Sequence, residues 1–301
     1  MINFTIVFPG QGSQQVGMGE TFQTDKDFRA CLDEAENLFS NPLKHIISHG
    51  TPEQLQQTAI AQPALLAIEI GMYRVFTKYI SQTPCFLAGH SLGEYSALVA
   101  GKTLSFHSAF QLVLKRAELM QKACEQYPGK MYALLKAEAS FVEKQCQIPP
   151  YQGKVVIWNY NSPEQLVLSG DKDLLTQFIQ DLKGEIPNKL KAIPLKVSGA
   201  FHSPLMVTAQ QELAKAIDNT SFQRSTIPIV MNVNASPSIE INDFKGNLKA
   251  QLTSPVRWTE TIQGMAQSGV THFIELGPGP VLSNLIKRIV PTASVYSIST
   301  L

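Results

Sequence analysis

Ser91 lies at the centre of the motif "GHSLG", a Gly-x-Ser-x-Gly pattern. The stretch "PCFLA" before it is short and apolar, which predicts a buried strand, and "EYSALVA" after it predicts a helix. The two glycines allow a tight turn that exposes the serine at the helix N-terminus, where free N–H groups favour negative charge. The pattern indicates a nucleophilic serine, and a serine in an ordinary strand-to-helix turn is the alternative.

A nucleophilic serine needs a base, because a free hydroxyl is a poor nucleophile at neutral pH. His90 is adjacent in sequence, so its side chain should point away from the hydroxyl. His202, in "VSGAFHSPLM", follows a predicted strand in a Gly/Ser-rich turn before a helix. We expect it at the mouth of a cleft as the base, and a helix-start histidine bonded to backbone is the alternative.

Arg116 falls in the middle of an apolar helical face. At about 100° per residue, this face also holds Ala109, Leu112, Val113 and Met120. An unpaired buried guanidinium is costly, so an anionic group should meet it. That group is either an internal Asp or Glu, or a ligand carboxylate held by two parallel hydrogen bonds.

A glycine-rich loop, "FPGQGSQ", occupies residues 8–14 directly after the first predicted strand. It lacks both the Lys-Ser/Thr of a phosphate-binding P-loop and the third glycine of a dinucleotide fingerprint. It offers close backbone approach and a neutral amide at Gln11. Beside the serine turn, these groups could help to form an oxyanion hole.

The elements that position these residues alternate between strands and helices in the first part of the chain. This order predicts an α/β fold with a parallel sheet covered on both faces. Residues 128–198 instead follow the order β-α-β-β-α-β, which predicts a ferredoxin-like small domain inserted between residues 1–127 and 199–301 of a large domain. We expect the strands "IPIVMNV" and "THFIELG" to rejoin the first sheet, and a ligand cleft at the domain junction.

Composition limits the function classes. The chain has 301 residues, 44% of them hydrophobic, and its 25 Lys+Arg against 24 Asp+Glu leave a net charge of +1. This balance gives no reason to expect nucleic acid or a membrane as a partner. The start reads as a strand rather than a signal peptide, and we find no uninterrupted apolar run long enough to span a bilayer. The four cysteines show no Cys-x-x-Cys spacing, so we expect no disulfide framework, no metal site and a cytoplasmic location.

Six motifs in order carry a family resemblance: "FPGQGSQ", "GHSLGEYSAL", "KRAELMQ", "NYNSPEQLVLSG", "GAFHSPLM" and "ELGPGPVL". Together they resemble malonyl-CoA:acyl-carrier-protein transacylases, including the discrete acyltransferases that serve polyketide synthases in trans. The resemblance covers essentially the whole chain. It implies an α/β-hydrolase-like body with a ferredoxin-like insert.

The resemblance also implies roles for single residues. Ser91 matches the nucleophile that becomes malonylated, His202 its general base, and Arg116 the arginine that pairs with the malonyl carboxylate. The backbone N–H groups of Gln11 and Leu92 match the oxyanion hole. Gln251, in "KAQLTSPVRW", matches a glutamine whose backbone we expect to orient the histidine.

Further implications concern selectivity and partners. Phe201 and Leu92 match family positions at which Phe and Leu accompany the use of malonyl rather than methylmalonyl substrates. Lys130 and Tyr132 depart from the small residues usual in the family, so they could alter the cleft wall or carrier docking. The expected partners are malonyl-CoA and an acyl carrier protein of fatty-acid or polyketide synthesis, with no bound cofactor and a monomeric enzyme.

Two other functions stay open at this point. One is an acyl hydrolase that clears carriers, although Arg116 favours transfer. The other is a carrier-docking module with vestigial catalysis. For docking of an acidic carrier we expect a locally basic rim with four candidates: Lys102, Lys115, Lys130 and Lys189.

Overall fold

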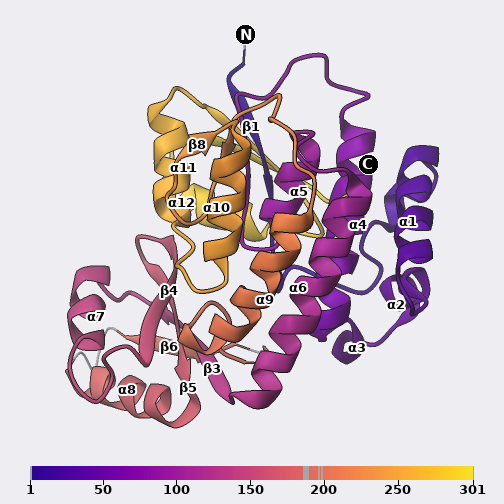
Figure 1. Ribbon diagram of the computed structural model, residues 1–301. Helices are drawn as coiled ribbons and strands as arrows, with labels where there is room; N and C mark the ends of the chain where they lie inside the picture. The colour runs from indigo at the N-terminus through magenta and orange to yellow at the C-terminus, as the bar shows by residue number, and fades with distance from the viewer. Residues whose placement is uncertain (1, 186–189, 196, 198, 301) are drawn as a thin grey trace.

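The computed structural model describes residues 2–185, 190–195, 197 and 199–300. Two sheets organise the chain: one of six strands and one of four. Figure 1 shows the four-stranded sheet with its two helices at the lower left, apart from the larger body above and to the right. The predicted α/β class, with a parallel sheet and a separate small domain, is confirmed.

The large sheet has the order β10-β9-β1-β2-β7-β8. All neighbouring pairs are parallel except β7 with β8. Both strands expected to rejoin this sheet do so, since β7 pairs with β2 and β9 with β1. The strands are β1 (Phe4–Phe8), β2 (Phe86–Gly89), β7 (Ile229–Val230), β8 (Pro237–Ser238), β9 (His272–Leu276) and β10 (Ser294–Ile298).

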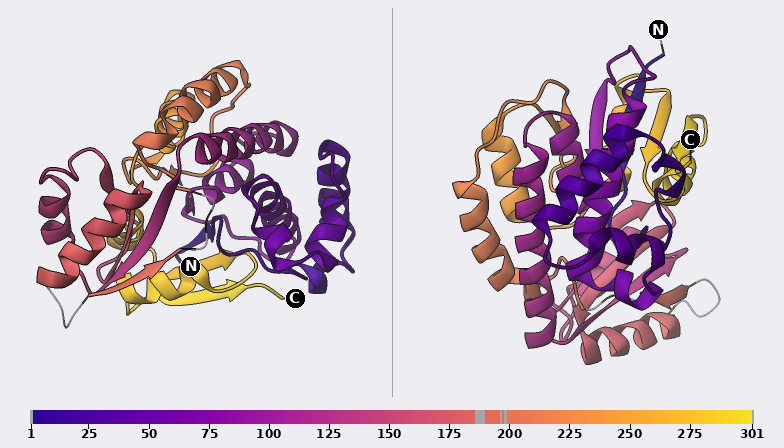
Figure 2. Two further views of the ribbon diagram at one scale, coloured as in Figure 1. Left: turned by 90° about the horizontal axis from the view of Figure 1, so that it is seen from below. Right: turned by 90° about the vertical axis from the view of Figure 1, so that its right-hand side faces the viewer.

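Helices cover both faces of this sheet (Figure 2). Alternation along β1 separates two apolar clusters: Ile6 and Phe8 pack into one, and Val7 into the other. Helices α4 and α5 lie in the first cluster, and α11 and α12 lie in the second. The helices of the large domain are α1 (Lys26–Leu38), α2 (Leu43–His49), α3 (Pro52–Gln56), α4 (Thr58–Phe76), α5 (Gly93–Ala100), α6 (Phe106–Gln126), α9 (Val207–Asn219), α10 (Ile241–Gln251), α11 (Trp258–Gln267) and α12 (Val281–Ile289), with short 3-10 turns at Glu20–Phe22 and Pro204–Met206.

The small domain follows the predicted order of elements. It runs through β3 (Gly129–Leu135), α7 (Ala139–Cys146), β4 (Val155–Ser162), β5 (Gln165–Asp171), α8 (Lys172–Glu185) and β6 (Lys191–Pro194). The sheet order is β4-β5-β3-β6 and every pair is antiparallel, as in a ferredoxin-like unit. Its own core lies between this sheet and α7 and α8. Asp171 accepts hydrogen bonds from the N–H groups of Asp173 and Leu174, so it caps α8.

Helix α4 begins earlier than its sequence suggests. A proline is usual in the first turn of a helix, which would start this helix near Pro63, but it starts at Thr58 and Pro63 lies inside it. By length and composition α4 could cross a membrane, although Gln62, Glu69 and Arg74 interrupt its apolar run. However, 72% of its apolar window is buried, because the helix packs among α1, α5 and α6. In this structure α4 is therefore a core helix.

Candidate active site

The turn between β2 and α5 is an elbow that holds Ser91 in a left-handed conformation, with φ of 53°. Glycines make this turn possible. A Cβ at Gly93 would lie 2.1 Å from the carbonyl oxygen of Phe8, and one at Gly89 would lie 1.9 Å from backbone atoms of Gly93. The flanking glycines are therefore required by close backbone approach, as the motif predicts.

His202 reaches the elbow from the segment between β6 and the 3-10 turn at Pro204. Its Nε2 lies 2.5 Å from the Ser91 hydroxyl oxygen, and its Nδ1 lies 3.0 Å from the backbone carbonyl oxygen of Gln251. A carbonyl can only accept, so the proton is on Nδ1 and Nε2 accepts the Ser91 hydroxyl proton. The imidazole thus has the tautomer that a general base for Ser91 requires, and its Nδ1 partner is a carbonyl rather than an acid.

Burial keeps this imidazole neutral. His202 is 5% exposed, and desolvation together with the positive charge of Arg116 holds its pKa well below 6.5. The Trp158 ring lies against it at a centroid distance of 4.8 Å. A neutral imidazole can accept a proton, which is what base catalysis needs.

Arg116 projects from α6 to the same point and is 1% exposed. Nη1 donates to Oε1 of Gln62 at 2.8 Å, and Nη2 donates to Oε1 of Gln251 at 3.1 Å and to the Ser91 hydroxyl oxygen at 2.9 Å. None of these acceptors is charged. Within the described chain no Asp or Glu forms an ion pair with Arg116, so the internal-partner alternative does not hold for a direct contact.

The loop after β1 brings Gln11 beside the elbow. The Gln11 side chain is already occupied, since Nε2 donates to the Thr58 hydroxyl at 3.1 Å and Oε1 accepts from Gln62 at 3.2 Å. A Cβ on Gly10 would lie 2.4 Å from the His90 carbonyl oxygen, so the two backbones touch here. The loop geometry therefore favours a role for the backbone N–H of Gln11 rather than its side-chain amide.

A small cavity of about 90 Å³ joins these groups. Ser91, His202, Arg116, Gln11 and Phe201 all line it, together with His90, Met120, Met131, Asn159, Leu195 and Val197. Leu92 is the N-cap of α5 and its side chain is fully buried. The structure thus brings every predicted site residue to one point, with Leu92 and Gln251 behind the cavity wall.

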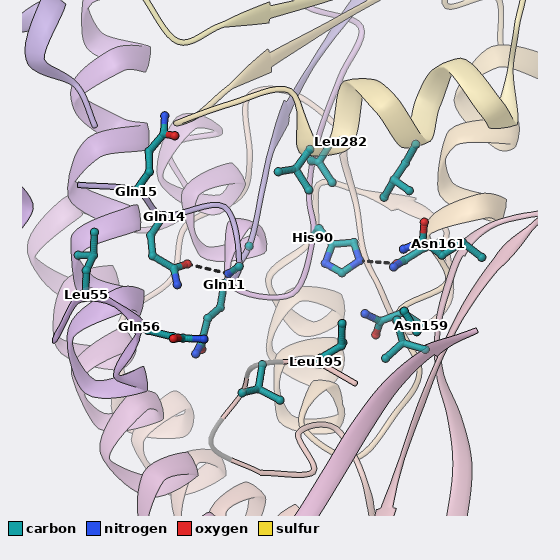
Figure 3. A pocket seen from close by; sticks show the side chains of 18 of the residues that line it. Gln11, Gln14, Gln15, Leu55, Gln56, His90, Asn159, Asn161, Leu195 and Leu282 are labelled. Atoms are coloured by element: carbon teal, nitrogen blue, oxygen red, sulfur yellow. Dashed lines mark hydrogen bonds between the residues drawn. The ribbon is translucent and has the colours of Figure 1, made fainter. Parts of the chain in front are cut away.

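A larger hollow of about 620 Å³ opens beside this cavity and shares part of its lining (Figure 3). Gln11 and Gln56 point into it from one side and Asn159 and Leu195 from the other. His90 lines this hollow with its Nε2 bonded to Asn161 at 3.0 Å, so it is not a partner of the Ser91 hydroxyl. The hollow lies between the large and small domains, as expected for a ligand cleft.

Lys130 and Tyr132 were expected to alter either the cleft wall or carrier docking, and the structure does not place them in the cleft wall. Strand alternation directs Met131 and Ala133 toward the cavities, whereas Tyr132 packs against the small-domain core on the opposite face. Lys130 shares that opposite side of β3. The two departures from the family pattern therefore do not line the cleft.

The predicted basic rim stays a prediction, and the three candidate lysines that the structure describes lie outside the cavity and cleft linings. Lys102 lines a separate hollow with Arg74, and Lys115 pairs with Glu118 on α6. Among the described residues, neither these two lysines nor Lys130 line the cavity or the cleft. Lys189 lies outside the described residues.

Sequence reasoning missed three residues that hold the site. Asn232, just after β7, accepts the Ser91 N–H at 2.7 Å and donates to the Gly89 carbonyl at 2.6 Å. Gln62 bonds Arg116, and Glu94 is wholly buried beneath the elbow. Of these three residues, Glu94 could have been found from the sequence, because a carboxylate in the first turn of an apolar helix needs buried partners.

The fold and the site define an α/β protein in which an elbow serine is bonded to a neutral histidine, an arrangement found in serine-dependent acyl-transferring and hydrolytic enzymes. The model of the acyl transferase domain matches residues 5–299, so the chain belongs to the acyl transferase domain family and is an acyltransferase.

Similar proteins support this assignment. The chain is 40% identical to the malonyl CoA-acyl carrier protein transacylase of Bacillus subtilis over 96% of this chain and 91% of that protein. It is 39% identical to the Haemophilus influenzae protein of the same name, over 99% and 96%. The solved acyl carrier protein S-malonyltransferase from Vibrio cholerae matches with a TM-score of 0.93 and 38% identity, over 99% and 97%.

A further solved structure holds a partner. It is a malonyl-transacylase in complex with a type II PKS acyl-carrier protein, and its chain matches with a TM-score of 0.94 and 35% identity, over 99% and 96%.

Proposed function

We propose that this acyltransferase moves a malonyl group from malonyl-CoA to the phosphopantetheine thiol of an acyl carrier protein, through an ester on Ser91. The contact between the Ser91 hydroxyl, a neutral His202 and an Arg116 without a carboxylate partner carries this proposal. The names of the relatives supply the substrate and the carrier. The product would serve chain extension in fatty-acid or polyketide synthesis.

The first half-reaction forms the ester. Ser91 Oγ attacks the thioester carbonyl while its proton moves to His202 Nε2. The C–S bond then breaks, and CoA leaves as a thiol with the proton from His202. In the second half-reaction the carrier thiol attacks the ester, and the proton returns to Ser91. His202 serves as base and then acid in both, with Nδ1 held by the Gln251 carbonyl.

The backbone N–H groups of Gln11 and Leu92 would stabilise the oxyanion of each tetrahedral intermediate. Leu92 is the N-cap of α5, so its N–H lies at the positive end of a helix. The contact between Gly10 and the elbow backbone keeps the Gln11 loop close to Ser91. No metal or cofactor enters this scheme.

Arg116 would select the acyl group. Its guanidinium is buried with only neutral acceptors, so a malonyl carboxylate would supply the missing negative charge through charge-assisted hydrogen bonds. Acetyl-CoA offers no carboxylate and leaves this charge uncompensated. Phe201 and Met120 close the cavity around the short acyl chain.

Intact-protein mass spectrometry after brief incubation with malonyl-CoA tests the proposal. We expect one malonyl-sized adduct on the wild type, none with acetyl-CoA, and none on Ser91→Ala. His202→Ala should form the adduct about 100-fold more slowly or worse. Free CoA without an adduct would instead indicate hydrolysis, and neither product would indicate a docking module without catalysis.

We also expect a monomer in the cytoplasm, which size-exclusion chromatography with light scattering and cell fractionation would check. A stable dimer or a membrane-associated fraction would contradict these two expectations.

A further inference from the structure

Glu94 lies in the first turn of α5, directly beneath the elbow, and is 0% exposed. Among the described residues, each oxygen of the Glu94 carboxylate has one hydrogen-bond partner. Oε1 accepts the backbone N–H of Asn232 at 2.7 Å, and Oε2 accepts Nε2 of Gln251 at 2.6 Å. Glu94 therefore acts on the described part of the site through Asn232 and Gln251.

These two residues hold Ser91 from both sides. The side-chain oxygen of Asn232 accepts the Ser91 N–H at 2.7 Å, and Nε2 of Gln251 donates to the Ser91 carbonyl at 2.9 Å. The positive φ of Ser91 is a conformation that non-glycine residues rarely adopt, so it needs such support. Glu94 is the common anchor of both supports.

The carboxylate also sets the direction of the Gln251 amide. A carboxylate only accepts, so it must face the NH₂ end of that amide. The amide oxygen then faces Arg116 Nη2 at 3.1 Å. The reverse orientation would place an NH₂ group against the guanidinium, donor against donor. Glu94 and Arg116 therefore both favour the same orientation of the Gln251 amide.

This arrangement keeps the negative charge one residue away from Arg116. A direct ion pair with Glu94 would use guanidinium N–H groups that an incoming carboxylate needs. With Gln251 between them, the charge of Glu94 still favours the arginine cation. Nε of Arg116, meanwhile, is buried with no hydrogen-bond partner in the described part of the chain.

We propose that Glu94 is a positioning residue that, through Gln251, aims the guanidinium of Arg116 and so sets the preference for acyl groups bearing a carboxylate. The proposal rests on the proposed roles of Ser91 and Arg116. It assigns Glu94 no contact with substrate. Its loss should slow transfer of a charged acyl group more than transfer of an uncharged one, because only the charged group needs an aimed Arg116, whereas both need the Ser91 supports.

Glu94→Gln tests this. If the side-chain oxygen of the new glutamine still accepts the Asn232 N–H, its NH₂ group faces the NH₂ group of Gln251. Two donors then oppose each other, which favours rotation of the Gln251 amide by half a turn. We expect the second-order rate of Ser91 malonylation by malonyl-CoA to fall about tenfold or more. Acetylation of Ser91 by 4-nitrophenyl acetate, an uncharged donor followed by its nitrophenolate burst, should fall by a smaller factor of about threefold, because the turned amide also loses its bond to the Ser91 carbonyl.

Glu69→Gln is the matched control, since Glu69 is also 0% exposed but bonds to Ser96 and not to the site. It should leave both rates unchanged. Gln251→Met is a second variant, which removes the amide but keeps the backbone carbonyl that holds His202. It also removes the hydrogen bond to the Ser91 carbonyl, so both rates should fall, with malonylation falling at least about threefold further than acetylation. It decides the question if thermal melting shows that Glu94→Gln does not fold.

Equal loss of malonylation and acetylation, or wild-type rates for both, would overturn the role of Glu94. A wild-type protein that takes no malonyl group on Ser91 would overturn the proposed function instead. The two failures are therefore distinguishable.

Discussion

Nη2 of Arg116 lies 2.9 Å from the Ser91 hydroxyl oxygen, so the proposed carboxylate clamp touches the proposed nucleophile. The oxygen accepts from Arg116 while its proton is directed to His202. An acyl group on Ser91 must consequently lie within reach of the guanidinium. This proximity suits a short acyl chain whose far end is negatively charged.

Replacing Arg116 by alanine should remove the selectivity. We expect Arg116→Ala to malonylate Ser91 about 100-fold or more slowly, because a charge-assisted bidentate interaction is lost. Acetylation by 4-nitrophenyl acetate should stay within about tenfold of wild type. Stopped-flow rates with both donors check this, with Arg74→Ala, a half-exposed arginine paired with Glu34, as the control. If Arg116→Ala kept its preference for malonyl over acetyl, the clamp would be wrong.

Local sequence patterns predicted two features of this site, the elbow at Ser91 and the burial of Arg116. The glycines around Ser91 indicate the elbow, and the apolar stripe around Arg116 indicates its burial, because both effects act within one turn or one helix. The order of strands and helices likewise predicted the small domain. All of these features depend on neighbours in sequence.

Contacts between distant segments could not be predicted in the same way. Asn232 and Gln251 meet Ser91 across 141 and 160 residues, and no periodicity encodes such a pairing. The positions of the candidate lysines relative to the cleft could not be predicted for a related reason. Lys102 and Lys115 are close in sequence, yet Lys102 lies in the turn after α5 and Lys115 lies on the exposed side of the next helix. Only the folded chain decides which face a side chain reaches.

The pH dependence should differ between charged and uncharged donors. Burial and Arg116 hold the pKa of His202 well below 6.5, so acetylation by 4-nitrophenyl acetate should persist well below pH 6.5. Burial raises the pKa of Glu94 to about 7, opposed by hydrogen bonds from Asn232 and Gln251 and by the charge of Arg116. Below that pH Glu94 takes a proton and loses one acceptor position, so malonylation should decline. Tyr95, the other titratable group at Arg116, stays neutral because burial raises its pKa to about 12.

Rates measured from pH 5 to 8 with both donors check this difference. In Glu94→Gln, which has no carboxyl to titrate, the decline of malonylation near pH 7 should be absent. Parallel profiles for the two donors in the wild type would contradict the separate roles of His202 and Glu94.

The close approach of Gly10 to the elbow should matter for the oxyanion hole. In Gly10→Ala the new Cβ would lie 2.4 Å from the His90 carbonyl oxygen, so the two backbones must separate. We expect acylation by either donor to fall about 100-fold, as for loss of one oxyanion donor. Gly264→Ala, where a Cβ meets nothing within 4 Å, is the control and should leave the rates unchanged. A wild-type acylation rate in Gly10→Ala would show that the Gln11 N–H is not needed.

Glu69 should lower stability at neutral pH rather than raise it. Burial raises its pKa well above the ordinary 4.5, the Ser96 hydroxyl bond opposes this, and nearby Glu275 adds to it. Between pH 4.5 and the raised value, the unfolded chain has released a proton that the folded chain retains. The free energy of unfolding therefore decreases as pH rises through this range.

Glu69→Gln removes this dependence while keeping an acceptor for Ser96. At pH 8 we expect the free energy of unfolding of the variant to be at least about 1 kcal/mol larger than that of the wild type. The reason is that the variant has no charge to bury or neutralise on folding. Near pH 4 the two should be similar, because Glu69 is protonated in both states. Urea unfolding across this pH range measures the difference, with the exposed Glu118→Gln as control. A difference between variant and wild type that did not grow with pH would mean that Glu69 is ionised in the folded core.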